Sequence, residues 1–435
     1  MNRFISNLLL LVIPLLAFLP VKATPIDVLH YRASIEPDIS NKKVKGTVSI
    51  EFKALHNTRE ISFDCDGLKI SQLELIGIAS SYVIKGRKVY IRLQESLETT
   101  ETYEVQMTYE GNPRWGVVFH PEVPSVSTVF STSQWMVCKE AIEDKATLDL
   151  TIIAPKGLTI VASGQWRGQT ELSGERIASN WLLKQPVSAY IFGFAIGPFH
   201  STSQKHRHTH FHYFSAQRNS KELLQIFTET ANMLDFFEEK SGIRYPDSTY
   251  HQILFKGSIS QEMANFCILR ENYGEQVLND SAAVNLSGHE LAHQWWGNQV
   301  TCKDWTHFWL NEGMAVYMST AFREHRWGKE AYEADMKVYY DAFQKVVQKG
   351  KDKALVFPHW NNPSSDDRIL VYYKGAYVFH LLRQELGDQT FWQALQKYTQ
   401  TYYGKSVVTT DLQRIFEEVS RLDLDPFFNK WVYKK

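Results

Sequence analysis

The chain has 435 residues, which is long enough for two or three domains that each bury a core of their own. Its 47 Lys and Arg nearly balance its 48 Asp and Glu, so the formal net charge is only -1. This balance argues against an electrostatic nucleic-acid-binding protein, which would carry a basic excess.

The first 23 residues have the pattern of a secretory signal peptide. Arg3 precedes a nearly continuous apolar run over residues 8–19, and Ala23 ends a short cleavage motif. An uncleaved membrane anchor is the alternative, which the shortness of the run and Pro14 disfavour. No later segment is long and apolar enough to span a membrane. We therefore predict cleavage after about Ala23 and export to a periplasm or the extracellular medium.

Residues 24–204 are predicted to form a mainly antiparallel β domain. Apolar and polar residues alternate over 44–52, 88–93, 103–109 and 148–153, as expected for strands with one buried face. Gly, Pro and Asn residues separate these stretches, and no comparable helical pattern interrupts them.

Residues 205–435 are predicted to form a mostly helical domain, so the whole chain belongs to the α+β class. Apolar residues recur at helical spacing over 220–240 and through most of 275–435. Ser220 is the expected N-cap of the first helix, and Gly242 follows its end. A short β-like patch runs from 250 to about 269.

Four alternating histidines lie near the junction of the two parts: His206, His208, His210 and His212. On a single strand their side chains would share one face, where they would bind a metal ion or simply face solvent.

The four cysteines are Cys65, Cys138, Cys267 and Cys302. They form no C-x-x-C unit, which argues against a structural zinc site. Disulfides and buried free thiols remain equal alternatives.

Residues 289–293 read His-Glu-Leu-Ala-His and indicate a catalytic metal site. Positions i and i+4 of a helix lie one above the other, so His289 and His293 can bind the same zinc ion. Glu290 lies beside that face, where its carboxylate can act as general base on a water molecule.

Two histidines leave a tetrahedral ion without enough ligands, so a third protein ligand is required. Glu312 follows His293 after 18 residues, enough to end one helix, turn near 297–301 and return along a second helix. A His, His, Glu set with one open position is typical of catalytic zinc. We therefore predict one Zn2+ per chain, held by His289, His293 and Glu312.

The motif at 289–298, together with residues 309–313 and 372–376, resembles the gluzincin aminopeptidases of the alanyl/leucyl type, which include leukotriene hydrolase-related members. The resemblance covers nearly all of the predicted mature chain. It implies a saddle-like β domain followed by a thermolysin-like catalytic domain, and peptide or protein substrates. It also implies that Tyr372 donates a hydrogen bond to the oxyanion of the transition state.

The sequence departs from this family at the strand that binds the substrate. Family members read G-x-M-E-N there, and the glutamate binds the free α-amino group. The positions that the resemblance assigns to substrate binding are Gln261, Glu262, Met263, Ala264 and Asn265, with Gln134 from the β domain.

The acidic residue has moved from the fourth position of this motif to the second, Glu262. Side chains alternate along a strand, so we expect Glu262 and Ala264 to share one face, about 6.6 Å apart. Two interpretations stay open: Glu262 binds the amine of a shifted substrate, or it pairs elsewhere and amine recognition is lost.

The resemblance ends with the catalytic domain, at residues 412–432, and does not extend to the helical domain that covers the active site in typical family members. We predict a zinc-dependent peptidase, most simply an aminopeptidase with altered amine recognition. The alternatives are a zinc endopeptidase with an open cleft and a catalytically silent peptide-binding relative.

Overall fold

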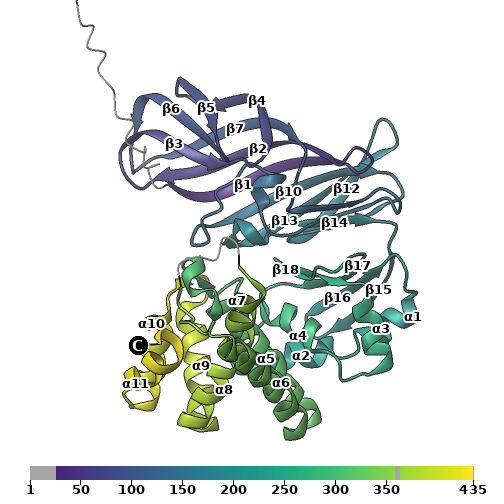
Figure 1. The fold of residues 1–435 in the computed structure, drawn as a ribbon. Coiled ribbons are helices and arrows are strands. Elements are labelled where there is room, and N and C mark those ends of the chain that lie inside the picture. Colours follow the sequence, from purple (N-terminus) through teal and green to yellow (C-terminus); the bar gives the residue numbers. More distant parts are fainter. Residues whose placement is uncertain (1–25, 358–362, 435) are drawn as a thin grey trace, which may run out of the picture.

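The computed structural model describes residues 26–357 and 363–434. The predicted signal peptide lies outside these residues. Figure 1 shows a strand-rich upper part and a lower part in which helices pack beside a second sheet. This confirms the predicted α+β class, with the β-rich part preceding the helical part in the chain.

A seven-stranded sheet forms the main layer of the β domain. Neighbouring strands are antiparallel except β1 and β10, which are parallel. In sheet order the strands are β12 (Gln165–Leu172), β13 (Arg176–Ser188), β10 (Lys145–Pro155), β1 (Ile26–Asp38), β2 (Lys43–Ala54), β7 (Thr102–Gly111) and β4 (Leu68–Leu75). The alternation predicted the strands correctly because every second side chain, such as Val48, Ile50 and Phe52 of β2, is buried.

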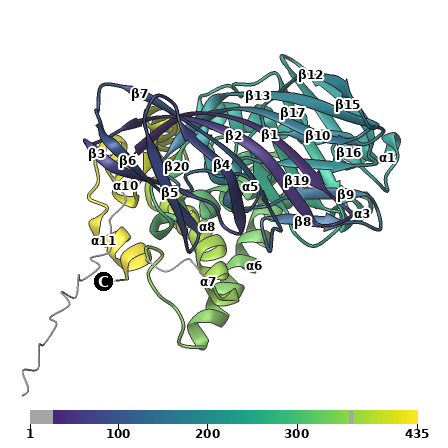
Figure 2. The same cartoon turned by 90° about the horizontal axis from the view of Figure 1, so that it is seen from above.

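Two smaller antiparallel sheets complete the β domain, seen from above in Figure 2. One contains β3 (Thr58–Asp64), β6 (Lys88–Leu97) and β5 (Ser80–Lys85). The other contains β11 (Thr159–Ala162), β14 (Phe194–Gly197), β9 (Ser125–Thr128) and β8 (Val117–His120). Two 3-10 turns, η1 (Thr132–Gln134) and η2 (Ala189–Ile191), lie among these strands.

The second, mostly helical part of the chain begins with a five-stranded mixed sheet. Its order is β15 (His200–His206), β16 (Thr209–Ser215), β17 (Thr249–Phe255), β19 (Phe266–Arg270) and β18 (Gln261–Met263). The first hairpin therefore spans the boundary predicted between residues 204 and 205. Strand β18 lies at the edge of the sheet.

Helices pack beside this sheet, and α5 lies among them in contact with α4, α6 and α8 (Figure 1). The helices are α1 (Ser220–Ile226), α2 (Thr230–Ser241), α3 (Asn272–Asn279), α4 (Asn285–Ala292), α5 (Trp309–Trp327), α6 (Lys329–Gln348), α7 (Ser365–Ile369), α8 (Gly375–Leu386), α9 (Asp388–Tyr402), α10 (Thr409–Ser420) and α11 (Asp425–Phe428). Shorter elements are the 3-10 turn η3 (Trp305–His307), the π-helical turns η4 (Leu370–Lys374) and η5 (Asn429–Tyr433), and the paired strands β20 (Thr301–Cys302) and β21 (Ser406–Val407).

The single helix predicted over 220–240 is two helices, α1 and α2, with a break between Ile226 and Thr230. The predicted N-cap is also wrong by one residue. Asn219 accepts hydrogen bonds from the backbone N–H groups of Lys221 and Glu222, and Glu222 closes a capping box. Gly242 does end α2, with a φ of 68°.

The four alternating histidines do not share one strand, because a turn at Arg207 (φ 53°) separates β15 from β16. His206 lies 2.8 Å from Asp235, and His212 stacks on His251 with ring centroids 5.1 Å apart. In the part of the chain that the structure describes, no cluster suited to a metal ion contains any of the four.

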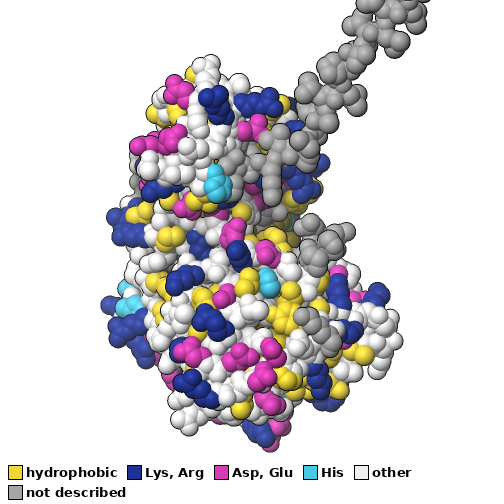
Figure 3. All heavy atoms as spheres, turned by 90° about the vertical axis from the view of Figure 1, so that its left-hand side faces the viewer, with side chains coloured by type: hydrophobic (Ala, Val, Ile, Leu, Met, Phe, Trp, Pro, Cys, Tyr) yellow, Lys and Arg dark blue, Asp and Glu magenta, His cyan; other side chains and the backbone are white. Residues whose placement is uncertain are grey.

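All four cysteines are buried free thiols. Within the described ranges, no helix is long and apolar enough to cross a membrane. Basic and acidic side chains are interspersed on the face in Figure 3, as the near-zero net charge suggests.

Candidate metal centre and active site

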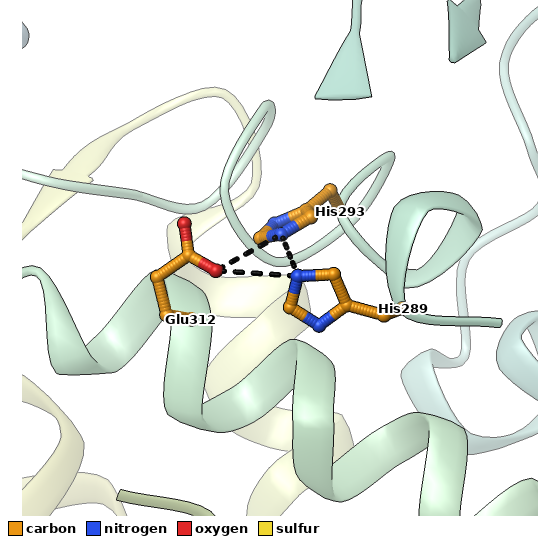
Figure 4. A group of neighbouring side chains, drawn as sticks. All are labelled: His289, His293 and Glu312. Carbon is orange, nitrogen blue, oxygen red and sulfur yellow. Dashed lines mark hydrogen bonds and ion pairs between the residues drawn. The ribbon is translucent and has the colours of Figure 1, made fainter. Parts of the chain in front are cut away.

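Two helices bring three ligand atoms to one point, as Figure 4 shows. His289 lies on α4, His293 is the C-cap residue of that helix, and Glu312 lies in the first turn of α5. The Nε2 atoms of the histidines are 3.1 Å apart, and Glu312 Oε2 lies 3.2 Å from His289 Nε2 and 3.5 Å from His293 Nε2. The sequence-predicted ligands therefore converge.

The hydrogen bonds around this cluster fit a bound cation. His293 Nδ1 donates to the carbonyl of Trp296 at 3.0 Å, so the Nε2 lone pair faces the other two ligands. Both His293 and Glu312 are buried. Two imidazole nitrogens and a carboxylate oxygen that face one another in a buried site are a zinc ligand set.

Electrostatics at the cluster also favour a positive charge. Burial by itself lowers the pKa of His293, but the carboxylates of Glu262, Glu312 and Glu290 outweigh it and raise the pKa to about 10. Burial would raise the pKa of Glu312, yet the two imidazoles lower it to about 2. Three acidic groups thus surround the point where a divalent cation would bind.

The turn after α4 requires a glycine at position 297. Gly297 has a φ of 131°, and a Cβ there would lie 2.6 Å from His293 Nδ1. The turn leads through β20 to α5 and so returns Glu312 to the histidines, as the spacing predicted.

Glu290 and Tyr372 border the same cavity, which has a volume of about 390 Å³. Burial, followed by the nearby Glu262 carboxylate, raises the pKa of Glu290 well above its ordinary value. The Tyr372 ring stacks on His289 with centroids 6.0 Å apart, and burial raises its pKa. The phenol therefore stays protonated and can donate a hydrogen bond.

Tyr372 lies in the π-helical turn η4, an uncommon conformation that often occurs at functional sites. Directly after it, Gly375 of α8 packs on Gly313 of α5: a Cβ on Gly313 would lie 2.9 Å from the Gly375 backbone. This close helix contact places η4, which contains Tyr372, against α5, which contains Glu312.

The strand expected for the predicted substrate-binding motif ends before Ala264. Strand β18 ends at Met263, and Ala264 and Asn265 form a two-residue turn into β19. Asn265 takes a φ of 70°, which asparagine tolerates at the third position of a turn. Glu262 and Ala264 therefore do not share one face of a continuous strand.

Only Glu262, among the five predicted residues of this motif, borders the cavity. Met263 O accepts a hydrogen bond from Gln294 at 3.0 Å, and the Asn265 side chain donates to Asp247 at 2.8 Å. Gln261 is buried and donates to Glu262. Met263 and Asn265 thus hold the turn in place.

Glu262 is buried beside Glu290. One carboxylate oxygen of Glu262, one of Glu290 and one ring nitrogen of His293 lie within 4.8 Å of one another. Oε2 accepts from Gln261 Nε2 at 2.6 Å, whereas the buried Oε1 has no partner among the described residues. Burial raises the pKa of Glu262 to about 7.

Gln134 is buried and lies outside the lining of this cavity; its Oε1 accepts from the backbone N–H of Arg114 at 2.9 Å. Residues that sequence reasoning missed include Phe130 from the β domain, Ser260 and Arg270. Their role depends on packing between distant segments, and no local pattern signals it.

Comparison with known proteins identifies both halves of this fold. Residues 28–191 match the peptidase M1 N-terminal domain, and residues 226–431 match the peptidase family M1 domain. The chain belongs to peptidase family M1.

Curated relatives of this chain include aminopeptidases. It is 28% identical to aminopeptidase N of Lactococcus lactis subsp. lactis, over 93% of this chain and 50% of that one. It is 24% identical to aminopeptidase N of Haemonchus contortus, over 88% of this chain and 43% of that one. The chain therefore spans about half the length of these relatives.

Solved M1 structures share the fold over nearly the full length. The M1 zinc metallopeptidase of Deinococcus radiodurans matches with a TM-score of 0.80 and 24% identity, covering 94% of each chain. A two-domain M1 zinc metallopeptidase variant bound to L-tryptophan matches with a TM-score of 0.80 and 23% identity, also covering 94% of each chain. The M1 fold thus includes both described domains.

Proposed function

We propose that this M1 protein is a zinc-dependent aminopeptidase. The observation that carries the proposal is the convergence of a three-residue zinc ligand set, a buried general base and a phenol on one cavity. The aminopeptidase relatives support it.

His289, His293 and Glu312 would hold the ion, and zinc bound there would polarise the scissile carbonyl and lower the pKa of water. Glu290 takes the proton from the attacking water and returns it to the leaving amine. The Tyr372 hydroxyl donates a hydrogen bond to the carbonyl oxygen as negative charge develops there.

Glu262 supports recognition of a free N-terminus. Its buried Oε1 has no hydrogen-bond partner among the described residues, and its carboxylate lies near that of Glu290, so a substrate ammonium group would supply both a hydrogen bond and a counter-charge. Because the acid has moved within the motif, we infer that the amine binds to Glu262 rather than to position 264.

An endopeptidase is the second candidate, favoured by a neighbouring cavity of about 380 Å³ that shares Phe130 and Tyr372 with the first. A peptide that extended through both cavities would have residues on each side of the scissile bond. Digesting matched free and N-acetylated peptides separates the two: an aminopeptidase cleaves only the free peptides, and an endopeptidase cleaves both.

Glu290→Gln tests the chemistry. The variant should bind one zinc ion per chain, measured by elemental analysis, and lose peptide hydrolysis by about 10²–10⁴-fold, because the general base is gone. Glu51→Gln, an exposed site on β2, is the matched control and should change neither quantity. Full activity of Glu290→Gln would refute the assignment.

We also propose that the protein is exported and that its leader is removed near Ala23, on the basis of the apolar run at 8–19. N-terminal sequencing of protein recovered from outside the cytoplasm should start at about residue 24. An intact Met1 on that protein would contradict the proposal.

A further inference from the structure

Arg270 borders the same cavity as Glu262 and Glu290 but takes no part in the chemistry proposed above. It is the last residue of β19, and its backbone N–H donates to Ser260 Oγ at 3.1 Å. Its guanidinium donates to the neutral Gln276 at 3.3 Å, whereas the buried Nε has no hydrogen-bond partner among the described residues.

The guanidinium also lacks a counter-charge. Over residues 26–357 and 363–434, no carboxylate forms an ion pair with Arg270. Half-buried arginines on the helices do have one: Arg323 of α5 pairs with Asp335, and Arg383 of α8 pairs with Glu324. A partly desolvated cation without an anion is costly, and a bound carboxylate would relieve that cost.

Arg270 and Glu262 border the same cavity, so a ligand bound there meets both charges. Arg270 Nε and Glu262 Oε1 are both buried and have no hydrogen-bond partner among the described residues. A peptide of two extended residues spans only about 7 Å, so a short peptide is small enough to place its ammonium group and its carboxylate in one cavity.

The cavity between these charges is small and partly apolar. Its volume of about 390 Å³ is near the lower end for small-molecule sites, and Leu286, Val316 and Tyr339 line it. Side chains of a dipeptide or tripeptide would pack on these walls, whereas a long chain would have to pass Arg270 without placing a carboxylate there.

We propose that Arg270 binds the C-terminal carboxylate of short peptides and that di- and tripeptides are the preferred substrates of this site. The planar guanidinium suits a carboxylate because two parallel N–H groups can donate to its two oxygens. This inference rests on the proposed peptidase function and specifies its substrate class.

The test compares leucyl peptides of two to five residues, each as the free acid and as the C-terminal amide. For the zinc-loaded protein, we expect kcat/KM to favour the acid over the amide by at least about tenfold for two and three residues, and by little for five. Arg270→Gln should bring the ratio for short peptides to within about twofold of one, and Arg270→Lys should keep part of it.

The acid-to-amide ratio separates carboxylate binding from a structural role, because misfolding lowers both rates alike. Arg59→Gln, on the exposed surface of β3, is the matched control and should keep the wild-type ratio. A ratio near one in the wild type at every length, or an unchanged ratio in Arg270→Gln, would overturn the inference.

A binding experiment keeps the two proposals distinguishable. Calorimetry on zinc-loaded Glu290→Gln with Leu-Ala and Leu-Ala amide measures carboxylate recognition without turnover. Tighter binding of the acid by at least about tenfold, lost on adding Arg270→Gln, would support the inference even if no peptide were hydrolysed. Equal or undetectable binding of both would refute it.

Discussion

Glu262 places a second carboxylate next to Glu290, the proposed general base, at a cost that the protein alone does not offset. Its Oε2 is held by Gln261, but Oε1 is buried without a partner among the described residues. A buried unpartnered carboxylate oxygen destabilises a fold unless something binds it. A substrate ammonium group is a suitable partner, since Glu262 borders the cavity that also contains Glu290.

Glu262→Gln should therefore change which peptides are cleaved. The variant keeps the size and the polar contact of the side chain and removes the charge that attracts an amine. We expect the ratio of kcat/KM for free over N-acetylated peptides to fall by about tenfold or more. Zinc content should stay at one per chain, and an unchanged ratio would show that the amine binds elsewhere.

At the scale of elements, the contact between α5 and α8 positions Tyr372, the proposed oxyanion donor, near the proposed metal ligands. Alanine is normally better than glycine inside a helix by about 1 kcal/mol. Here glycine occurs at both Gly313 and Gly375, because a Cβ at either position would lie within 3.0 Å of the other backbone. The helices approach closely, and η4 holds Tyr372 beside His289.

Gly313→Ala should reverse the usual preference and destabilise the protein. Backbone atoms cannot yield as a flexible side chain can, so the helices must separate, at a cost of about 1–3 kcal/mol. Urea unfolding should show this loss, and kcat should fall as Tyr372 shifts.

Tyr372→Phe is the comparison variant for the same contact. It should lower kcat by about 10²–10³-fold, because one oxyanion donor is lost. Its urea midpoint should stay near that of the wild type. A Gly313→Ala protein with wild-type stability and kcat would contradict this account of the helix contact.

At the scale of the whole molecule, the β domain supports the active site directly. Lys145 on β10 donates to the carbonyls of Gln299 at 2.5 Å and Lys405 at 3.2 Å, in the segments that lead into β20 and β21. The Ala264 N–H donates to Ile191 of the β domain at 3.0 Å. Phe130 of the β domain lines the cavity, so neither domain forms the site alone.

Lys145 makes this interface dependent on pH. Burial lowers its pKa from 10.5 to about 7. Between pH 7 and 10.5 the unfolded chain therefore binds more protons than the folded one, and the contribution of Lys145 to stability rises with pH. Below about pH 7 the folded protein must bury the charged amine, and that contribution is at its lowest.

Lys145→Met measures this effect. The free energy of unfolding of the wild type minus that of the variant should increase between pH 7 and pH 9, by at most about 1.4 kcal/mol per pH unit. Urea titrations at several pH values provide the measurement, with exposed Lys53→Met as the control. A difference that falls or stays constant over this window would contradict the sign.

The sequence by itself determined the parts of this protein that depend on local periodicity. Histidines four residues apart face the same way on any helix, so His289 and His293 were predictable, and the spacing to Glu312 allowed one return helix. Alternating side chains likewise predicted β2, β6, β7 and β10, because each strand buries one face.

Only the tertiary structure decided what surrounds the metal site. The turn at Ala264–Asn265 depends on contacts of Asn265 with Tyr245 and Asp247, about twenty residues away. Arg270 reaches the cavity only because β19 ends beside α4. Such contacts join segments far apart in the chain, and no periodicity encodes them. Local geometry thus specified the predicted metal ligands, and long-range packing specified the cavity around them.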